Sequence, residues 1–433
     1  MRLLVYQLIY PFVALLILLK LAWSGRARAL DETRADVLER LGVVTPPEDD
    51  GRPLLWVHAA SVGETLSAAP LLKALSERPE RARVLMTCST ATGRAKARAL
   101  PGVDAAALAP ADFLPCVALF LLRSRPRVLV LVESELWPMT LCAAAWSGAR
   151  MGVVNGRITA RAHRRYLALR GLFTSLLRRF ERVAAQSEAD AARFRALGVA
   201  PEALRSCGNM KYDGAPASEE ARAAAAGIFA RLGWTGAPVW VAGSTRPGEE
   251  KVLLDAHREA AGRRPALRLV LAPRHPERCG EAAGLLEAAG IPYVRWSELG
   301  EGPGAAPEGV GCLLVDRLGV LGGLYSWALA SFVGGTLVPV GGHNLLEPAR
   351  LGSPVLFGPH TEGIPEPAEM LVKTGGGCVV RSSGELAAKL EEWLESPVRR
   401  AVAGQGAKLA AEQFSGATQR TLEHLEPLLS IKP

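Results

Sequence analysis

The sequence predicts an α/β protein with two Rossmann-like domains, each built on a parallel sheet covered by helices, and a hydrophobic helix at the N-terminus. Short apolar runs alternate with longer stretches of helical pattern from residue 54 onward. Many of these runs are continuous in Val and Leu, which is typical of strands buried on both faces. The alternation pauses after residue 210 and restarts at residue 238, so the 433 residues divide into two similar units.

The N-terminal segment 1–24 is expected to be a membrane anchor. Residues 3–23 are nearly all apolar and approach the ~20 residues that span a bilayer, although Gln7, Pro11 and Lys20 interrupt them. A helix that lies in the interface or packs in the core is the alternative. No small-residue cleavage site follows, which argues against a removed signal peptide. Arginines do follow, and their charge predicts that the remaining chain lies on the cytoplasmic side of the inner membrane.

Residues 25–214 are assigned to the first domain. Its expected strands are 54–59, 83–88, 127–133, 150–155, 182–186 and 204–209. Residues 215–235 contain many small and polar residues and are assigned to a linker. The second domain, residues 236–400, has expected strands at 238–244, 267–273, 311–316, 328–335, 354–359 and 376–380. Residues 401–433 are expected to form a helical tail without a further strand.

Composition excludes several classes of function. The 51 Lys and Arg residues outnumber the 43 Asp and Glu residues, so the net charge of +8 suits an anionic membrane, an acidic substrate or nucleic acid. Aromatic residues make up only 6% of the chain, which argues against nucleic acid. The basic stretch 161–180 is interpreted as a helix facing anionic lipid or as an ordinary solvated helix. The cysteines and histidines lack CxxC or HExxH spacing, so neither disulfides nor a metal site is expected.

Open parallel sheets bind ligands at the carboxyl ends of their strands, so the loops there carry the candidate site residues, facing a cleft between the domains. Glu64 closes the segment WVHAASVGE, where a strand ends and a helical stretch begins. The spacing Ser61-x-x-Glu64 matches a capping box and, taken alone, favours that structural role. The position also suits a general base, because helix N-terminal amides favour a carboxylate that is ready to accept a proton.

Two further acids, one residue apart, lie at the end of the third expected strand, in VESELWP. Strand alternation places Glu133 and Glu135 on one side if the strand persists that far. A carboxylate at the end of a buried strand is costly unless it is paired or used in chemistry. Lys211 or an arginine is the expected partner, and a structural ion pair is the alternative to catalysis.

Two glycines precede a helical stretch in GGHNLLEP, where the backbone can approach a ligand and the helix start suits a phosphate. The spacing Asn344-x-x-Glu347 also fits a helix cap. Arg274 follows the strand 267–273, where its guanidinium either binds a phosphate or forms a surface salt bridge. No GxxxxGK[ST] motif occurs, which excludes a P-loop ATPase.

Eight motifs occur in order between about residues 54 and 360, namely WVHAASVGE, VESELWP, NGR, CGNMKYD, AGSTRPGEE, APRHPER, DRLGVL and GGHNLLEPARLGSPVLFGPH. Together with the hydrophobic N-terminus and ERLG at 39–42, they resemble the membrane-anchored 3-deoxy-D-manno-octulosonic acid (Kdo) transferases of lipid A assembly. After GPH the chain continues TEGIPEPAEML, where the family commonly has an aromatic and asparagine-containing segment. The resemblance therefore assigns no ligand contact beyond His360.

The resemblance implies a GT-B glycosyltransferase that transfers Kdo from CMP-Kdo to a lipid A precursor, lipid IVA, with inversion, in lipopolysaccharide core biosynthesis. It implies no active-site metal and no cofactor, since CMP-Kdo is the donor substrate. By the same resemblance Glu64 is the general base, while Glu133 and Lys211 stabilise the transition state. The CMP-binding positions are Pro273, Arg274, Gly319, Val320, Leu321, Asn344, Leu345, Leu346 and Glu347.

Two other interpretations of the residues stay open. One is a different two-domain sugar-nucleotide enzyme, such as a UDP-sugar transferase or epimerase. The other is a membrane-anchored protein whose Rossmann-like domains bind a lipid or a protein partner without catalysis. The first predicts a preference for UDP over CMP, and the second predicts no turnover of any sugar nucleotide.

Overall fold

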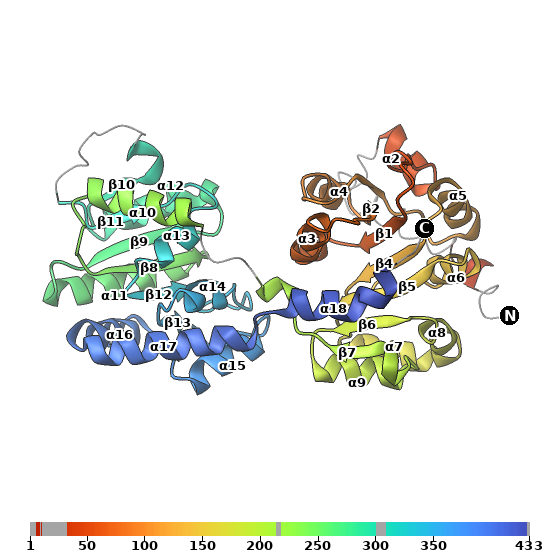
Figure 1. Ribbon diagram of the computed structural model, residues 1–433. Helices are drawn as coiled ribbons and strands as arrows, with labels where there is room; N and C mark the ends of the chain where they lie inside the picture. Colours follow the sequence, from red (N-terminus) through yellow and green to blue (C-terminus); the bar gives the residue numbers. More distant parts are fainter. Residues whose placement is uncertain (1–5, 9, 11–32, 214–217, 300–308, 431–433) are drawn as a thin grey trace. The chain divides into compact units, whose positions relative to one another are not determined.

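The computed structural model describes residues 6–8, 10, 33–213, 218–299 and 309–430. They fall into two compact units (Figure 1). The first unit comprises the described residues up to Asp213 together with those from Gly416 onward, and the second comprises the residues between them. Each unit has its own seven-stranded sheet.

The first sheet has the strand order β3-β2-β1-β4-β5-β6-β7, and every neighbouring pair is parallel. The strands are β1 (Leu54–Ala59), β2 (Arg83–Cys88), β3 (Ala105–Leu108), β4 (Val128–Val132), β5 (Arg150–Gly156), β6 (Arg182–Ala185) and β7 (Leu204–Ser206). The order reverses between the adjacent strands β1 and β4. Doubly wound sheets bind their ligands in the crevice that such a reversal leaves at the carboxyl ends of the strands.

Helices cover both faces of the first sheet because successive side chains of its buried strands point to opposite faces. Trp56 of β1 packs against Phe120 in one apolar cluster, whereas the next residue, Val57, belongs to the cluster on the other face. The helices are α2 (Arg34–Arg40), α3 (Val62–Ser76), α4 (Ala91–Arg98), α5 (Leu114–Ser124), α6 (Pro138–Trp146), α7 (Ala160–Ala168), α8 (Arg170–Leu177), α9 (Glu188–Ala196) and α18 (Ala417–Leu429). Two 3₁₀ turns complete the unit, η2 (Pro201–Ala203) and η3 (Met210–Tyr212).

The second sheet has the order β10-β11-β9-β8-β12-β13-β14 and is also parallel throughout. Its strands are β8 (Val239–Thr245), β9 (Arg268–Pro273), β10 (Tyr293–Arg295), β11 (Cys312–Leu314), β12 (Ala330–Val333), β13 (Val355–Phe357) and β14 (Gly377–Val379). Its helices are α10 (Glu219–Arg231), α11 (Glu249–Arg263), α12 (Cys279–Ala288), α13 (Leu321–Tyr325), α14 (Leu346–Arg350), α15 (Pro365–Lys373), α16 (Ser383–Glu395) and α17 (Pro397–Gln413), with 3₁₀ turns η4 (Pro276–Arg278) and η5 (Trp296–Leu299). The order reverses between β8 and β12.

The expected linker and tail differ from what the structure shows. Most of residues 215–235 form α10, whose Ile228 and Phe229 lie in the apolar core of the second unit. The tail consists of two helices, α17 in the second unit and α18 against the first sheet (Figure 1). Gly416 separates them, with a φ of 79° that favours glycine. The chain therefore crosses from one unit to the other a second time near its end.

No helix within the described residues is long and apolar enough to cross a membrane. The expected anchor, residues 1–24, lies outside the described part of the chain apart from residues 6–8 and 10. These contact the first unit, since the Tyr6 hydroxyl donates to the Asp112 carboxylate at 2.7 Å. The Gln7 side-chain oxygen accepts the Leu114 amide, at the start of α5, at 2.7 Å. One of the polar residues that interrupt the apolar run thus serves an otherwise unpaired helix amide.

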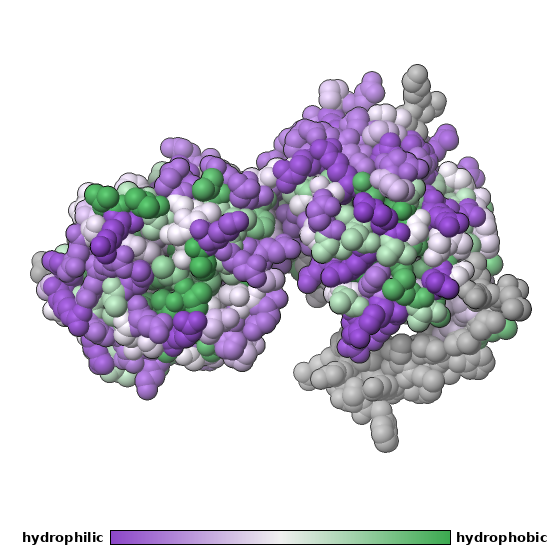
Figure 2. All heavy atoms as spheres, turned by 90° about the horizontal axis from the view of Figure 1, so that it is seen from below, coloured by the Kyte–Doolittle hydropathy of each residue, from purple (hydrophilic) through white to green (hydrophobic). Residues whose placement is uncertain are grey.

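The surface seen from below is largely hydrophilic, with smaller apolar patches between the polar residues (Figure 2). Some large apolar side chains are exposed, among them Trp146, Trp327 and Val398. Scattered residues of this kind are ordinary on folded domains and do not by themselves mark an interface.

Candidate active site

Glu64 lies at the carboxyl edge of the first sheet, in the first turn of α3. Ser61 is the N-cap of this helix, and its hydroxyl oxygen accepts the Glu64 amide at 3.2 Å. The Glu64 carboxylate turns back to accept the Ala60 amide at 2.7 Å and the Ser61 hydroxyl at 3.0 Å. The capping geometry expected from the spacing is therefore present, with the Ala60 amide as the return donor. It holds the carboxylate just beyond the end of β1.

Burial raises the pKa of the Glu64 carboxyl above its usual value. The hydrogen bonds from Ala60 and Ser61 favour the carboxylate, as expected from the sequence, but they do not offset the loss of solvent. A carboxylate with a raised pKa is a better proton acceptor than one in water. The cap fixes the orientation of Glu64 and leaves it chemically suited to act as a base.

Glu133 directly follows β4, across the reversal in strand order from Glu64. Its φ is 64°, in the left-handed region, while its amide donates to the Val154 carbonyl of β5 at 2.9 Å. A residue other than glycine keeps this strained conformation only where its surroundings impose it. Because the strand ends at Val132, the alternation that placed Glu133 and Glu135 on one side does not apply. The condition on which that prediction depended is therefore not met.

The ionisable side chains at the carboxyl edge of the first sheet shift one another's pKa values. Burial and then the charge of Glu64 raise the pKa of Glu133 to about 6, while Arg157 and Lys211 act in the opposite direction. Burial and Glu64 also raise the pKa of Glu135. Carboxylates this close resist being ionised together, so the cluster favours taking up a proton. The structure thus brings together the three residues predicted to be catalytic.

Lys211 lies on η3, and its side chain is exposed. The Asn209 side chain caps this turn by accepting the Lys211 amide at 3.0 Å. The Met210 amide donates to the side-chain oxygen of the buried Asn155 at 3.0 Å. The motifs NGR and CGNMKYD are therefore joined through Asn155, which fixes the turn beside the end of β5.

Arg157 is a cation of the cluster that the sequence analysis left unassigned. It follows β5 in the NGR motif and lowers the pKa of Glu133 ahead of Lys211. The signal was present in the sequence, because a charged residue directly after any buried strand of a parallel sheet lies at the edge where the other strands also end.

An apolar pocket adjoins the acidic loop. Ser134 and Glu135 form part of its wall, and the Trp137 indole, 39% exposed, donates to the Glu135 carboxylate at 2.7 Å. The remaining lining residues are aromatic, aliphatic or proline, namely Tyr6, Leu136, Pro138, Tyr166, Leu169, Leu172 and Phe173. This lining suits an apolar portion of a ligand, and Glu135 is the acid on its wall.

In the second unit, Pro273 is the last residue of β9 and Arg274 follows with an exposed side chain. The Arg274 amide donates to the Thr245 carbonyl at 3.0 Å, which joins the ends of β8 and β9. Both residues therefore lie at the carboxyl edge of the second sheet, where the nucleotide was predicted to bind.

The segment Gly319, Val320 and Leu321 leads into α13, with Gly319 at a φ of 86°. At the far end of this helix, Tyr325 is close enough to Glu347 for that carboxyl to raise the pKa of the tyrosine. Burial raises the pKa of Glu347 as well. The predicted segments around residues 319–321 and 344–347 are thus neighbours.

The Asn344 side chain makes the capping contact expected at the start of this helix, one residue before the assigned N-cap. Helix α14 has five residues, Leu345 before it is already helical in its backbone angles, and the Asn344 side-chain oxygen accepts the Leu346 amide at 3.1 Å. Leu345 and Leu346 are fully buried, and the Leu346 amide is bonded to the Asn344 side chain. Asn344 and Glu347 are the residues of this segment with partly exposed side chains.

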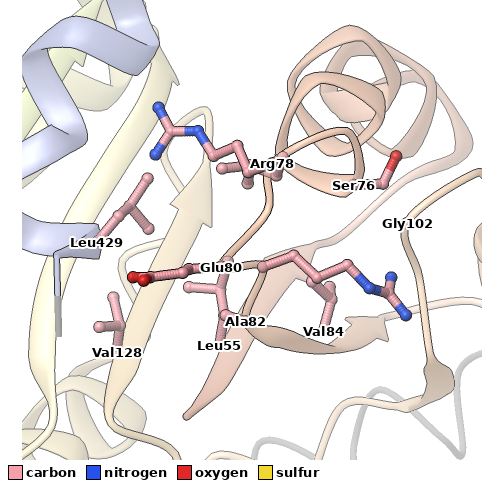
Figure 3. Close-up of a pocket in the computed structure, with 11 residues that line it drawn as sticks. Leu55, Ser76, Arg78, Glu80, Ala82, Val84, Gly102, Val128 and Leu429 are labelled. Carbon is pink, nitrogen blue, oxygen red and sulfur yellow. The ribbon is translucent and has the colours of Figure 1, made fainter. Parts of the chain in front are cut away.

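Two further features bear on the chemistry. Within the ranges that the structure describes, no cluster of three His, Cys, Asp or Glu residues could hold a metal ion, and metal-free chemistry stays a prediction. A small pocket lies at the other edge of the first sheet, lined by Leu55, Val84 and Val128 near the amino ends of three strands (Figure 3). Arg78 on its wall is paired with Glu426 at 2.7 Å. The binding edge of a parallel sheet is the opposite one, so this pocket is not the candidate site.

Comparison with known proteins identifies relatives along most of the chain. Residues 35–214 match the family described as 3-deoxy-D-manno-octulosonic-acid transferase (kdotransferase). The 3-deoxy-D-manno-octulosonic acid transferase of Bordetella pertussis is 36% identical over 387 residues, covering 87% of this chain and 87% of that protein. The protein of the same name from Haemophilus influenzae is 32% identical over 377 residues, again covering 87% of each chain.

Solved structures share the fold at low sequence identity. The structure of UDP-GlcNAc 2-epimerase from Neisseria meningitidis bound to UDP-GlcNAc has a TM-score of 0.56 and 13% identity. It covers 87% of this chain and 100% of that one. This likeness concerns the fold of the chain and not its substrate.

Proposed function

The chain belongs to the Kdo transferase family and is a glycosyltransferase, and from this premise we propose that it transfers Kdo from CMP-Kdo to a lipid A precursor, lipid IVA, with inversion at the anomeric carbon. The observation that carries the proposal is the acidic cluster at the reversal of the first sheet. Glu64 is held there by two hydrogen bonds, and its pKa is raised by burial.

Glu64 is the general base of the proposed reaction. The acceptor hydroxyl oxygen forms a bond to the anomeric carbon of Kdo while its proton moves to the Glu64 carboxylate. The bond between that carbon and the phosphate oxygen breaks, and its electron pair leaves with CMP. Attack opposite the leaving group inverts the configuration. A positioned base of this kind contributes typically ~10²–10⁴ in rate.

Lys211 and Glu133 have distinct proposed roles. Lys211 is an exposed cation on a fixed turn, suited to offset the sugar carboxylate or the departing phosphate. Glu133 has a pKa of about 6 and lies between cations and the base. In its ionised form it would face positive charge that develops at the anomeric carbon, and it would attract the cations Lys211 and Arg157.

The donor nucleotide is assigned to the second unit. Arg274 would bind the phosphate, and Pro273 would face the base or ribose at the end of β9. Residues 319–321 and 344–346 would form the wall of the nucleotide site, and the Glu347 carboxylate would accept hydrogen bonds from ribose hydroxyls. No cofactor or metal enters the proposed reaction.

Two surface features support a lipid acceptor at a membrane. The apolar pocket beside Glu135 suits an apolar portion of the acceptor. Exposed arginines occur on and near α7, none of them within 4.0 Å of a carboxylate in the described part of the chain, namely Arg161, Arg164, Arg165 and Arg170. Uncompensated cations attract anionic lipid and the phosphates of lipid A. We place the enzyme at the cytoplasmic face of the inner membrane, with residues 1–24 as its anchor.

Nucleotide selectivity tests the proposal against the rival enzymes. CMP is expected to raise the melting temperature of the full-length protein more than UDP at equal concentration, because ligand that binds the folded state stabilises it by mass action. Transfer from CMP-Kdo is expected to persist in EDTA. A larger shift with UDP would favour the UDP-sugar interpretation, and loss of turnover in EDTA would contradict the metal-free mechanism.

A further inference from the structure

Arg246, in the second unit, has no role in the proposed mechanism described above. It follows β8, next to the point where the strand order of the second sheet reverses. The Arg274 amide is bonded to the Thr245 carbonyl, so Arg246 and Arg274 leave neighbouring strands at the same edge. A half-buried arginine at this location lies among the residues predicted to bind the donor.

The guanidinium of Arg246 contacts two imidazoles. Its Nε donates to Nε2 of His343 at 3.0 Å, and one Nη lies 3.1 Å from Nε2 of His275. No carboxylate among the described residues lies within 4.0 Å of the guanidinium. The side chain is therefore held from two sides by neutral partners and not by an acid.

The chemistry of these contacts fixes the charge at the site. A guanidinium has only donors, so both imidazole nitrogens that face it accept and carry no proton. Each ring is then neutral, with its proton on Nδ1, and Nδ1 of His275 lies 3.7 Å from the Glu277 carboxylate. The positive charge of Arg246 is oriented without being neutralised. Such an arginine is ready for an anionic ligand.

The surrounding backbone is built to keep this arrangement. The fully buried Glu249 accepts the Arg246 amide at 2.8 Å and, through the same oxygen, the Gly335 amide at 2.8 Å. Gly335 has a φ of 73°, and a β-carbon there would lie 3.2 Å from Nε2 of His343. The missing side chain lets the imidazole approach Arg246. Ser244, with a φ of 56°, turns the chain just before the arginine.

We propose that Arg246, positioned by His275 and His343, binds an anionic group of the donor, either the phosphate or the carboxylate of the transferred sugar acid. This inference rests on the proposed function, since it assumes that the donor lies at the carboxyl edge of the second sheet. The N–H groups of Arg246 that do not face the two histidines form charge-assisted hydrogen bonds to the oxygens of that group.

Titration calorimetry with the full-length protein tests the proposal, using cytidine, CMP and CMP-Kdo as three probes. Arg246→Gln is expected to weaken binding about 10- to 100-fold for probes that carry the recognised anion. If the anion is the phosphate, CMP and CMP-Kdo are both weakened and cytidine is not. If it is the sugar carboxylate, only CMP-Kdo is weakened. Arg258→Gln, on α11 and paired with Asp255, is the matched control and should bind all three as the wild type does.

Equal dissociation constants for the wild type and Arg246→Gln with all three probes would overturn the inference while leaving the proposed function intact. Failure of the wild type to bind either CMP or CMP-Kdo would overturn both.

The histidines are tested as positioning residues by the Michaelis constant for CMP-Kdo. His343→Leu should raise it with little change in kcat, and His343→Gln, whose amide oxygen still accepts a hydrogen bond, should restore it. Equal Michaelis constants in the two variants would remove His343 from this role.

Discussion

Replacing Glu64 by glutamine removes the proposed base while leaving its surroundings almost unchanged. The amide oxygen can accept the Ala60 amide as the carboxylate does at 2.7 Å. The amide NH₂ can donate to the Ser61 hydroxyl, which has a second lone pair beside the one that accepts the residue 64 amide. The change is therefore expected to cost less than about 1 kcal/mol of folding free energy.

The catalytic effect is expected to be much larger. Loss of a positioned base reduces the rate about 10²- to 10⁴-fold. Each tenfold change corresponds to about 1.4 kcal/mol of activation free energy, so the expected cost is roughly 3–5 kcal/mol. The pKa of Glu64 is raised by burial, so the wild-type rate should rise with pH over a range above the usual glutamate pKa. The rise in rate reports the deprotonation of Glu64, so it should be altered in the Glu64→Gln variant.

Single-turnover transfer from CMP-Kdo to lipid IVA measures this directly, with CMP-Kdo binding and urea unfolding recorded on the same samples. Glu77→Gln, at the exposed C-cap of α3, is the matched control and should retain wild-type activity. A Glu64→Gln rate within about threefold of the wild type, with folding and donor binding intact, would refute the base assignment.

Other changes give separate tests. Lys211→Met should lower kcat about 100-fold with a small effect on folding, since its side chain is exposed, and an unchanged kcat would remove it from the mechanism. The pKa of Glu133 is raised from 4.5 to about 6, so its contribution to stability is complete below pH 4.5 and lost as pH rises through about 6. Glu133→Gln should therefore be more stable than the wild type at pH 8 but not at pH 4 in urea unfolding, whereas the same difference at both values would contradict the raised pKa. Arg274→Ala should weaken CMP-Kdo binding about tenfold or more by calorimetry, and an unchanged dissociation constant would exclude it from the donor site. Neutralising Arg164, Arg165, Arg178 and Arg179 together should reduce binding to anionic vesicles at low salt, and equal binding would leave them as solvated surface.

The strands that sequence analysis located are those with a strong apolar signal. VLVLV in β4 and LLWVHA in β1 are continuous apolar runs, and both appear within a residue or two of the expected ends. The edge strand β3 has the sequence AAAL, which lacks the β-branched and aromatic residues that mark strands. The edge strand β10 has three residues, too few for a pattern. Their place in the sheet is fixed by tertiary pairing.

The candidate site was predictable in its parts but not in its assembly. Glu64, Glu133 and Arg274 each follow an apolar run, and the rule that ligands meet strand ends is enough to select them. The strand order, which brings the ends of β1 and β4 together, could not be read from one sequence. The contact between Arg246 and His343 joins residues separated by 97 positions and was likewise hidden.

The predicted domain boundaries differ from the observed ones where a few residues decide the path of the chain. The helical pattern continues across residues 401–433, but Gly416 turns the chain so that α18 joins the first unit. The alanine-rich segment assigned to a linker forms α10 because Ile228 and Phe229 find an apolar core. Burial against distant residues overrides local composition in this segment.

Mass spectrometry of lipid IVA incubated with CMP-Kdo and the full-length protein tests the central claim most directly. The expected result is a mass increase of one or more Kdo residues that requires CMP-Kdo and does not occur with UDP-GlcNAc as the donor. An unchanged lipid IVA mass, or an equal gain of sugar from UDP-GlcNAc, would contradict the account.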